Sequence, residues 1–143
     1  MPRGVTLPEL VITVALASLM LGIAAPRLAE PLDTLSVEHA AAELAGAHAR
    51  ARVMAVVESR LTRLTVRADS LLLEVRVEDA WEPRWATAGP ARFDVALAGG
   101  ARTITFSPVG WSMGFSNATW TLTKGGAQRR VVVSRLGRLR IER

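Results

Sequence analysis

The chain has 143 residues, a formal net charge of +5 and no cysteine. This length allows one small domain beside a long helix, and the lack of cysteine excludes disulfides and thiolate or redox chemistry. Nearly all basic residues are arginine, with Lys124 the one lysine. Basicity alone is therefore weak evidence for a nucleic-acid partner, because a GC-rich genome produces the same bias.

An apolar run with one carboxylate opens the chain. Residues 5–25 would form a helix of about 32 Å at ~1.5 Å per residue, which matches a hydrocarbon core of about 30 Å. We therefore expect a transmembrane helix over residues 5–26. Glu9 lies at the head of this segment, where an acidic side chain costs up to ~2.5–3.5 kcal/mol. Such a residue needs a partner or a function.

The first resemblance lies in residues 4–10, which read Gly-Val-Thr-Leu-Pro-Glu-Leu. Pro26 follows near the end of the apolar run. This segment resembles the type III signal of type IV pilins and type II secretion pseudopilins. The resemblance implies that residues 1–4 are a leader peptide. It also implies that a prepilin peptidase cuts between Gly4 and Val5, and that the new N-terminus is methylated.

In the same family, the acidic residue of the signal attracts the terminal ammonium of a neighbouring subunit, and here that residue is Glu9. Two positions depart from the usual pattern: Val5 stands where phenylalanine is commonest, and Pro8 where a branched aliphatic residue is usual. Pro8 would lie in the first helical turn, where proline is tolerated. The alternative is an ordinary single-span anchor with an incidental glutamate.

Residues 27–60 are expected to continue the helix as an amphipathic segment. Pro31 should interrupt or kink it, and Asp33 or Thr34 would then cap a new segment that runs to about Ser59. Apolar residues at three- and four-residue intervals form a stripe for a sheet to cover: Val37, Ala40, Leu44, Ala47, Ala51, Met54 and Ala55. The charged residues opposite are expected to be solvated or to face neighbouring subunits, with intersubunit salt bridges as one option: Glu38, Glu43, Arg50 and Glu58.

From residue 61 the apolar period changes to two, which is typical of strands. Residues 61–67 and 71–78 flank a short polar turn and predict a hairpin. Further strands are expected around residues 93–97, 104–106, 120–122, 131–133 and 138–142, with turns at 99–100 and 124–126. Together they form a β-rich head over residues 61–143 that should pack directly on the helix.

The second resemblance lies in the C-terminal half. Residues 104–110, 119–122 and 131–140 are similar to the corresponding part of the GspH/FimT minor pseudopilins and minor pilins, and residues 49–55 resemble their Ala-Arg-rich helix end. The resemblance implies an α+β fold of the type IV pilin kind, in which a long N-terminal helix, transmembrane in its first half, packs on an antiparallel β-sheet head.

Residues 78–91 match no part of that family pattern. Trp81 and Trp85 lie in this stretch. Their rings either cover the edge of the core or stack on a ligand, and the first reading is favoured.

The segment Gly137-Arg138-Leu139-Arg140 is the one candidate site in the head. It resembles a C-terminal Gly-Arg-x-Arg element that is associated with DNA binding in some FimT-type minor pilins. If Leu139 and Ile141 face inward on a terminal strand, Arg138 and Arg140 face outward, and further arginines can lie nearby: Arg129, Arg130, Arg135 and Arg143. The DNA-binding candidates are Arg135, Arg138 and Arg140, which would grip phosphates without reading sequence. The alternative is that these arginines solubilise an edge strand.

Catalytic chemistry finds no support in the sequence. His39 and His48 are nine residues apart, which is not metal-ligand spacing on one helix face, and surface histidines are expected. No serine nucleophile motif, phosphate loop or paired carboxylate site stands out. We therefore expect no enzymatic activity, no cofactor and no metal.

The two resemblances together imply a minor pseudopilin subunit of a type II secretion system or of a type IV pilus-like filament, which acts in filament assembly and protein secretion. Before assembly it would cross the bacterial inner membrane once, with its C-terminal head in the periplasm or outside. Its partners would be other pilins or pseudopilins, the prepilin peptidase and the inner membrane. The alternative is a minor type IV pilin that binds double-stranded DNA for uptake in natural transformation.

Overall fold

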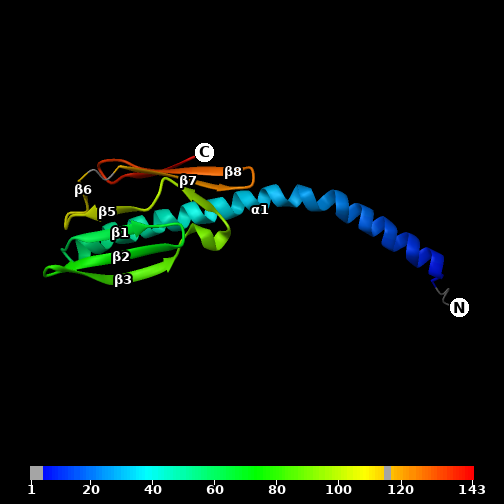
Figure 1. Cartoon of the computed structure of the whole chain (residues 1–143), viewed down its shortest axis with the longest axis horizontal. Helices are drawn as coiled ribbons and strands as arrows, with labels where there is room; N and C mark the ends of the chain where they lie inside the picture. Colours follow the sequence, from blue (N-terminus) through cyan, green and yellow to red (C-terminus); the bar gives the residue numbers. More distant parts are fainter. Residues whose placement is uncertain (1–4, 115–116) are drawn as a thin grey trace. The chain divides into compact units, whose positions relative to one another are not determined.

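The computed structural model describes residues 5–114 and 117–143, without the side chains of residues 23–28. It divides into two compact units, Met1–Leu32 and Asp33–Arg143. One long helix precedes all of the strands, and the strands form two antiparallel sheets (Figure 1).

A single helix, α1 (Leu7–Val57), begins near the N-terminus. Pro8 is its second residue, where the missing N–H has no intrahelical acceptor. The helix continues through Pro31, so the predicted interruption there and the predicted new cap at Asp33 or Thr34 are wrong. The other predicted option, a kink at Pro31, stays a prediction. A proline removes one hydrogen bond from the helix interior and costs ~3 kcal/mol. The alanine-rich turns that follow resume the helix without a new start.

The first turns of α1 expose their apolar side chains to solvent. These exposed residues are Leu7, Leu10, Val11, Ile12, Val14, Leu16, Leu19, Met20 and Leu21. Across the described ranges, 5–114 and 117–143, no helix reaches the length and apolar character required to cross a membrane. The transmembrane helix expected over residues 5–26 stays a prediction.

Five strands form the first sheet, in the spatial order β3-β2-β1-β5-β6. They are β1 (Thr62–Val66), β2 (Ser70–Val77), β3 (Ala80–Ala88), β5 (Arg102–Phe106) and β6 (Ser112–Met113). The predicted hairpin is confirmed, since Leu64 pairs with Leu73 and Val66 with Leu71. The strand predicted around residues 104–106 is also confirmed, and it lies beside β1.

The sequence did not predict β3, which lies at the edge of this sheet. Proline is tolerated on an edge strand because its missing N–H faces away from the neighbouring strand, and Pro83 interrupts the apolar alternation of β3. The pairing of β2 with β3 also shifts register between Leu73 and Glu74. Both features hide the two-residue period on which strand prediction depends.

Four strands form the second sheet, in the spatial order β4-β7-β8-β9. They are β4 (Ala96–Ala98), β7 (Ala118–Lys124), β8 (Ala127–Val133) and β9 (Leu139–Glu142). The strands predicted around residues 120–122, 131–133 and 138–142 are confirmed, although β9 begins at Leu139 rather than at Arg138. The β9 strand forms one edge of the sheet.

The strand predicted around residues 93–97 is mostly wrong. Residues Pro90–Phe93 form a 3-10 helix, η1, and Asp94 has a left-handed backbone with φ 59°. Only β4 is extended, because Pro90 starts a helical turn that the apolar alternation of the following residues conceals. The predicted turn at Gly99 is confirmed: its φ is 113°, and a side chain there would clash with the carbonyl oxygen of Thr119.

The apolar stripe of α1 packs against the inner faces of both sheets, as predicted. Its members Val37, Ala40, Leu44, Ala47, Ala51 and Ala55 are all 2% exposed or less, and Met54 packs against them. Small alanine side chains bring the helix close to the sheets. Trp120 and Phe106 are the largest side chains buried by the sheets, and Trp120 donates its indole N–H to the carbonyl of Gly100 at 3.2 Å.

Charged residues beside this stripe contact the chain's own sheets and the 3-10 helix η1. The contacts are Glu38 with Arg129 at 2.7 Å, Glu43 with Arg92 at 3.1 Å, Glu58 with Arg84 at 3.9 Å, and Arg50 over the Trp85 ring at 4.9 Å. Glu38 and Arg50 are exposed, in agreement with the predicted solvated surface, although all four residues also contact side chains of the same chain. A role of this surface toward neighbouring subunits stays a prediction. Sequence spacing places a charge on a helix face, but the position of the sheet decides what that charge meets.

Candidate functional site

The predicted processing and assembly site lies at the start of the chain. Gly4 lies outside the described residues, so the predicted cleavage site is described only from Val5 onward. The Val5 side chain is 72% exposed and precedes the helix. The amide of Leu10 donates to the carbonyl of Thr6 at 3.1 Å, which closes the first helical turn.

Glu9 lies within that first turn of α1 and is exposed. Partial positive charge gathers at a helix N-terminus because the first amide groups have no intrahelical acceptor, so a carboxylate is favoured there. Among the residues that the structure describes, Glu9 forms no ion pair. Its carboxylate is therefore available to a cation from another molecule, which is the geometry that the predicted assembly role requires.

The predicted DNA-binding residues lie around a tight turn between β8 and β9. The Ser134 amide donates to the Arg138 carbonyl at 2.9 Å, and the Arg138 amide donates back to the Ser134 hydroxyl at 3.1 Å. Gly137 takes φ 73° in this turn. Arg135 and Arg138 belong to the turn, and their backbone positions are therefore closely defined.

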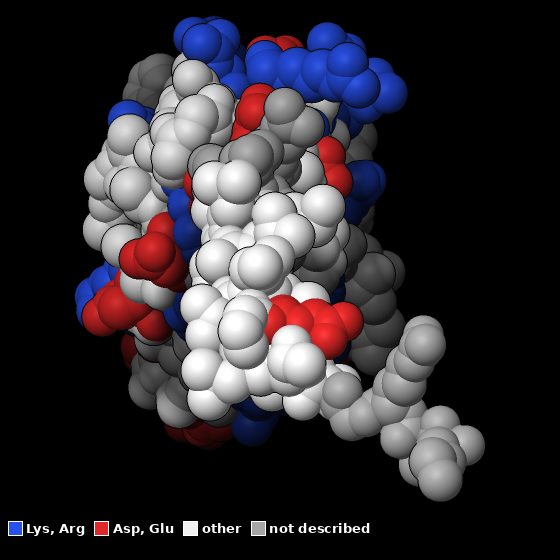
Figure 2. Space-filling model, turned by 90° about the vertical axis from the view of Figure 1, so that its right-hand side faces the viewer, with Lys and Arg blue, Asp and Glu red and all other residues white. Residues whose placement is uncertain are grey.

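Arg140 lies on β9 opposite Val132, on the face of the sheet that points away from α1. Arg135, Arg138 and Arg140 are all exposed, and within the described part of the chain none of the three forms an ion pair. In Figure 2, Lys and Arg side chains gather at the top, which is the β8 and β9 side in Figure 1. Arg135 and Arg138 thus lie in the β8–β9 turn, and Arg140 lies on the strand that follows it.

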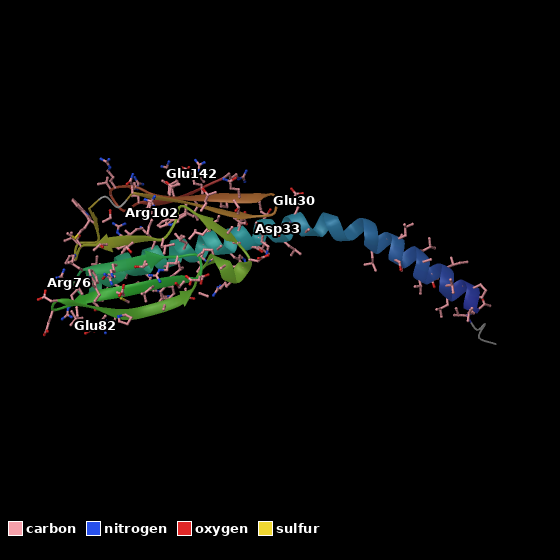
Figure 3. The ribbon with its side chains drawn as sticks, viewed as in Figure 1. Glu30, Asp33, Arg76, Glu82, Arg102 and Glu142 are labelled. Atoms are coloured by element: carbon pink, nitrogen blue, oxygen red, sulfur yellow. The ribbon has the colours of Figure 1, made fainter. Side chains whose placement is uncertain are left out.

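Two details make the basic surface around β9 smaller than the sequence predicted. Arg129 donates to Glu38 at 2.7 Å and is half-buried, so it does not add to the basic surface. Glu142 lies opposite Arg130 in the pairing of β8 with β9 and brings a carboxylate to the same face (Figure 3). Ile141, which was expected to face inward, is 43% exposed because β9 is an edge strand.

The two tryptophans of β3 contact arginines of the same chain. Trp85 packs against the core beneath Arg50. Arg63 lies 4.4 Å from the centre of the Trp81 ring and forms two hydrogen bonds with Glu74, at 2.6 and 2.9 Å. These bonds hold the pKa of the Arg63 guanidinium above its usual value. The favoured reading, a cover for the core edge, agrees with the contacts of Trp85 and stays a prediction for Trp81.

His48 is buried, so the prediction that it is a surface histidine is wrong. It is only 5% exposed, and its ring meets Phe106 edge-on with the ring centres 5.1 Å apart. Burial, followed by the nearby charge of Arg52, lowers the pKa of His48 to about 4. Its Nε2 has no hydrogen-bond partner in the described structure. His39 is exposed, as expected.

His48 also lines an apolar groove of about 610 Å³ between the last turns of α1 and the β8–β9 turn. The other lining residues are Ala49, Arg52, Val53, Val56, Val57, Gly137, Arg138 and Leu139. No single segment of the sequence contains this groove. It arises because the β8–β9 turn returns to the helix end. Among the described residues, no group of three or more His, Cys, Asp or Glu side chains is arranged to hold a metal ion.

Comparison with known proteins gives a consistent result. Residues 40–137 match the family model of the type II transport protein GspH. The pilin-like protein PilA1 of Thermus thermophilus is 30% identical over 157 aligned positions, which cover 98% of each chain. The match to the GspH model thus spans the second half of α1 and nearly the whole head.

Solved structures support the fold. Two crystal forms of the type IV minor pilin FimU of Pseudomonas aeruginosa PAO1 superpose with TM-scores of 0.60 and 0.59 at 20% identity. They cover 75% and 74% of this chain, and 88% and 92% of FimU. The family and the fold are those of structural filament subunits rather than of enzymes. The chain therefore belongs to the GspH family and is a minor pilin of the GspH/FimT type.

Proposed function

We propose that this chain is a minor pseudopilin that helps to assemble a type II secretion or type IV pilus-like filament, after cleavage between Gly4 and Val5. The observation that carries the proposal is the exposed apolar start of α1, with Glu9 in its first turn. Thr13 and Ser18 in this stretch return their hydroxyl groups to the helix carbonyls of Leu10 and Val14 at 2.9 and 2.8 Å. They can therefore enter an apolar environment without losing a hydrogen bond.

Before assembly, residues 5–26 hold the chain in the inner membrane. During assembly, Glu9 attracts the ammonium group that cleavage creates at Val5 of a neighbouring subunit. The two charges attract strongly at low dielectric, whereas a lone carboxylate in an apolar filament core is penalised. A register that pairs them is therefore favoured over registers that do not.

Processing is tested by expressing the full chain with and without a prepilin peptidase and measuring its intact mass. The expected result is loss of the leader Met1–Gly4 with addition of one methyl group. Gly4→Leu should block cleavage, because the peptidase recognises the small residue before the cut. An uncut chain in the presence of active peptidase would contradict the proposal.

Assembly is tested by the incorporation of Glu9→Gln into sheared filaments. This variant should be cleaved normally but incorporated about tenfold less, since one attraction of ~1.4 kcal/mol or more is lost. Glu58→Gln in the head is the matched control, and it should incorporate as the parent does. Equal incorporation of Glu9→Gln and the parent would contradict the role of Glu9.

The filament system is distinguished by deleting the gene and measuring two outputs. Loss of exoprotein secretion supports a type II secretion pseudopilin, which is the function that we favour. Loss of surface pili or of transformation with intact secretion would instead support a pilus subunit.

The second candidate function is capture of double-stranded DNA for uptake. The exposed side chains of Arg135, Arg138 and Arg140, which form no ion pair within the described residues, favour it. Full chain in nanodiscs of zwitterionic lipid should then bind duplex DNA with an affinity that falls steeply with salt. The Arg138→Ala/Arg140→Ala variant should lose this binding. No binding at low salt, or binding that does not depend on these arginines, would remove the DNA function.

A further inference from the structure

The groove beside His48 has walls that the rest of the head holds in place. Gly110 packs so closely on α1 that an added Cβ would lie 3.1 Å from Val56 Cγ2 and 3.3 Å from Arg52 Nε. The Gly110 amide donates to the Ser107 carbonyl at 2.8 Å, which secures this loop. The helix wall of the groove, including the stem of Arg52, therefore has a defined position.

The opposite wall is secured in the same way. Ser112 on β6 donates its hydroxyl to the carbonyl of Arg135 at 2.7 Å. Gly137 packs against Ser112, with only 3.3 Å between an added Cβ and the Ser112 side chain. The turn that carries Arg138 is thus attached to the first sheet as well as to its own. A groove with two fixed walls is preformed, which lowers the entropic cost of binding.

The groove combines an apolar floor with unpaired positive charge. Val53, Val56 and Val57 are 60%, 49% and 76% exposed. The end of the helix therefore exposes three apolar side chains that no other part of the described chain buries. Arg52 and Arg138 also line the groove. In the described ranges, neither arginine has a carboxylate within 4 Å. By contrast, the helix carboxylate of Glu43 pairs with Arg92 at 3.1 Å.

The His48 ring also lines the groove, but its Nε2 is buried and lacks a hydrogen-bond partner among the described residues, so this atom is closed to a ligand. The site therefore offers an apolar contact surface and two cations. An occupant that suits both has aliphatic side chains and a carboxylate.

We propose that this groove binds an acidic, leucine- or valine-rich peptide segment of a neighbouring filament subunit, with carboxylates on Arg52 and Arg138 and aliphatic side chains on Val53, Val56 and Val57. The naming of a filament subunit as the source rests on the proposed function, whereas peptide binding by the groove does not. A volume of about 610 Å³ suits a few side chains rather than a whole helix. Duplex DNA fits poorly, because its phosphates would leave the valines exposed.

The test uses the full chain in zwitterionic nanodiscs and a short fluorescent peptide in which leucine alternates with glutamate. Fluorescence anisotropy should show saturable binding. Arg52→Gln and Arg138→Gln should each weaken it by about tenfold, the loss expected for one charge-assisted hydrogen bond. Arg140→Gln, an equal change of charge outside the groove, is the matched control and should bind as the parent does. Loss of binding in all three variants alike would overturn the proposal by showing only general attraction.

Two further arms identify the contacts. Val53→Asp changes an exposed residue, so the fold should persist, and it should weaken binding of the acidic peptide by repulsion. The double variant Arg52→Glu/Arg138→Glu should bind a leucine-lysine peptide in place of the leucine-glutamate one. Failure of this charge reversal, or equal binding of a leucine-glutamine peptide by the parent, would contradict the proposal.

A last experiment distinguishes a peptide occupant from a lipid occupant. It also tests peptide binding by the groove separately from the proposed filament function. Vesicles of phosphatidylglycerol should not displace the acidic peptide, and displacement that depends on Arg52 and Arg138 would identify an anionic lipid as the occupant and overturn the proposal. If the peptide binds but the chain is neither cleaved nor incorporated into filaments, the groove stands and the proposed function fails. If incorporation occurs without peptide binding, the groove proposal alone fails.

Discussion

Residues 7–22 and residues 37–55 of α1 are both rich in aliphatic side chains, yet the first stretch is exposed, whereas an apolar stripe of the second is buried by two sheets. The difference lies in side-chain size and in pattern. The buried stripe is narrow and mostly alanine, with charges beside it, whereas the exposed stretch has large aliphatic side chains on every side and Glu9 as its one charge. A stripe can be covered by the chain's own sheets, but an apolar surface on every side needs a lipid or several other helices. The second stretch thus serves folding, and association is the role that we propose for the first.

The largest expected effect on stability distinguishes a buried tryptophan from an exposed one. Trp120 is completely buried, and Trp111 is 67% exposed. Trp120→Ala should reduce the free energy of unfolding by about 3–5 kcal/mol through loss of burial and creation of a cavity. Trp111→Ala is the matched control and should change it by less than roughly 0.5 kcal/mol. Urea unfolding followed by circular dichroism measures both, and equal losses would show that Trp111 is part of the folding core.

The next effect concerns His48, the polar residue within the buried stretch. The pKa of His48 is lowered to about 4 in the folded chain, whereas an unfolded histidine has a pKa near ~6.5. Between these values the unfolded state binds the extra proton, so the free energy of unfolding falls as pH falls. The loss from pH ~7 to pH ~4 should reach up to about 3 kcal/mol.

Urea unfolding at a series of pH values measures this slope. The His48→Leu variant should lose it, because no proton is taken up at that position on unfolding. His39→Leu removes an exposed histidine of the same helix and should retain the slope. An unchanged slope in His48→Leu would assign the pH dependence to other groups.

A smaller effect tests the alanine stripe itself. Ala51 is completely buried, and Ala51→Leu should destabilise the head by about 1–3 kcal/mol because the sheets must move to admit the larger side chain. Ala42 is exposed on the same helix, and Ala42→Leu should leave stability nearly unchanged. The two variants should be compared by their denaturation midpoints. If both are tolerated equally, close approach of the helix to the sheets is not required.

The smallest effect concerns the charges beside the stripe. A double-mutant cycle of Glu38→Gln and Arg129→Gln should give a coupling of about 0.2–1 kcal/mol in the isolated chain, which weakens at high salt. This pair joins the helix to the second sheet at 2.7 Å. A coupling seen only in assembled filaments would instead support a contact between subunits.

Much of the head followed from local pattern. Alternation predicted β1, β2, β5, β7, β8 and β9, and the three- and four-residue spacing predicted the buried stripe, because both patterns reflect which side of an element meets water. The pattern failed where local chemistry conflicts with it. The Pro83 edge strand, the Pro90 helical turn and the continuous helix at Pro31 each depend on how neighbouring segments tolerate one proline.

The candidate sites divide in the same way. The sequence by itself determined the glycine turn with exposed arginines on both sides and the single acid at the head of the apolar segment, because each consists of neighbouring residues whose spacing sets their geometry. Only the tertiary structure decided that Glu38 meets Arg129, that His48 is buried, and that Arg52 and Arg138 line one groove. These contacts join residues far apart in the chain. Their partners follow from how two sheets close over one helix, and no local spacing encodes that closure.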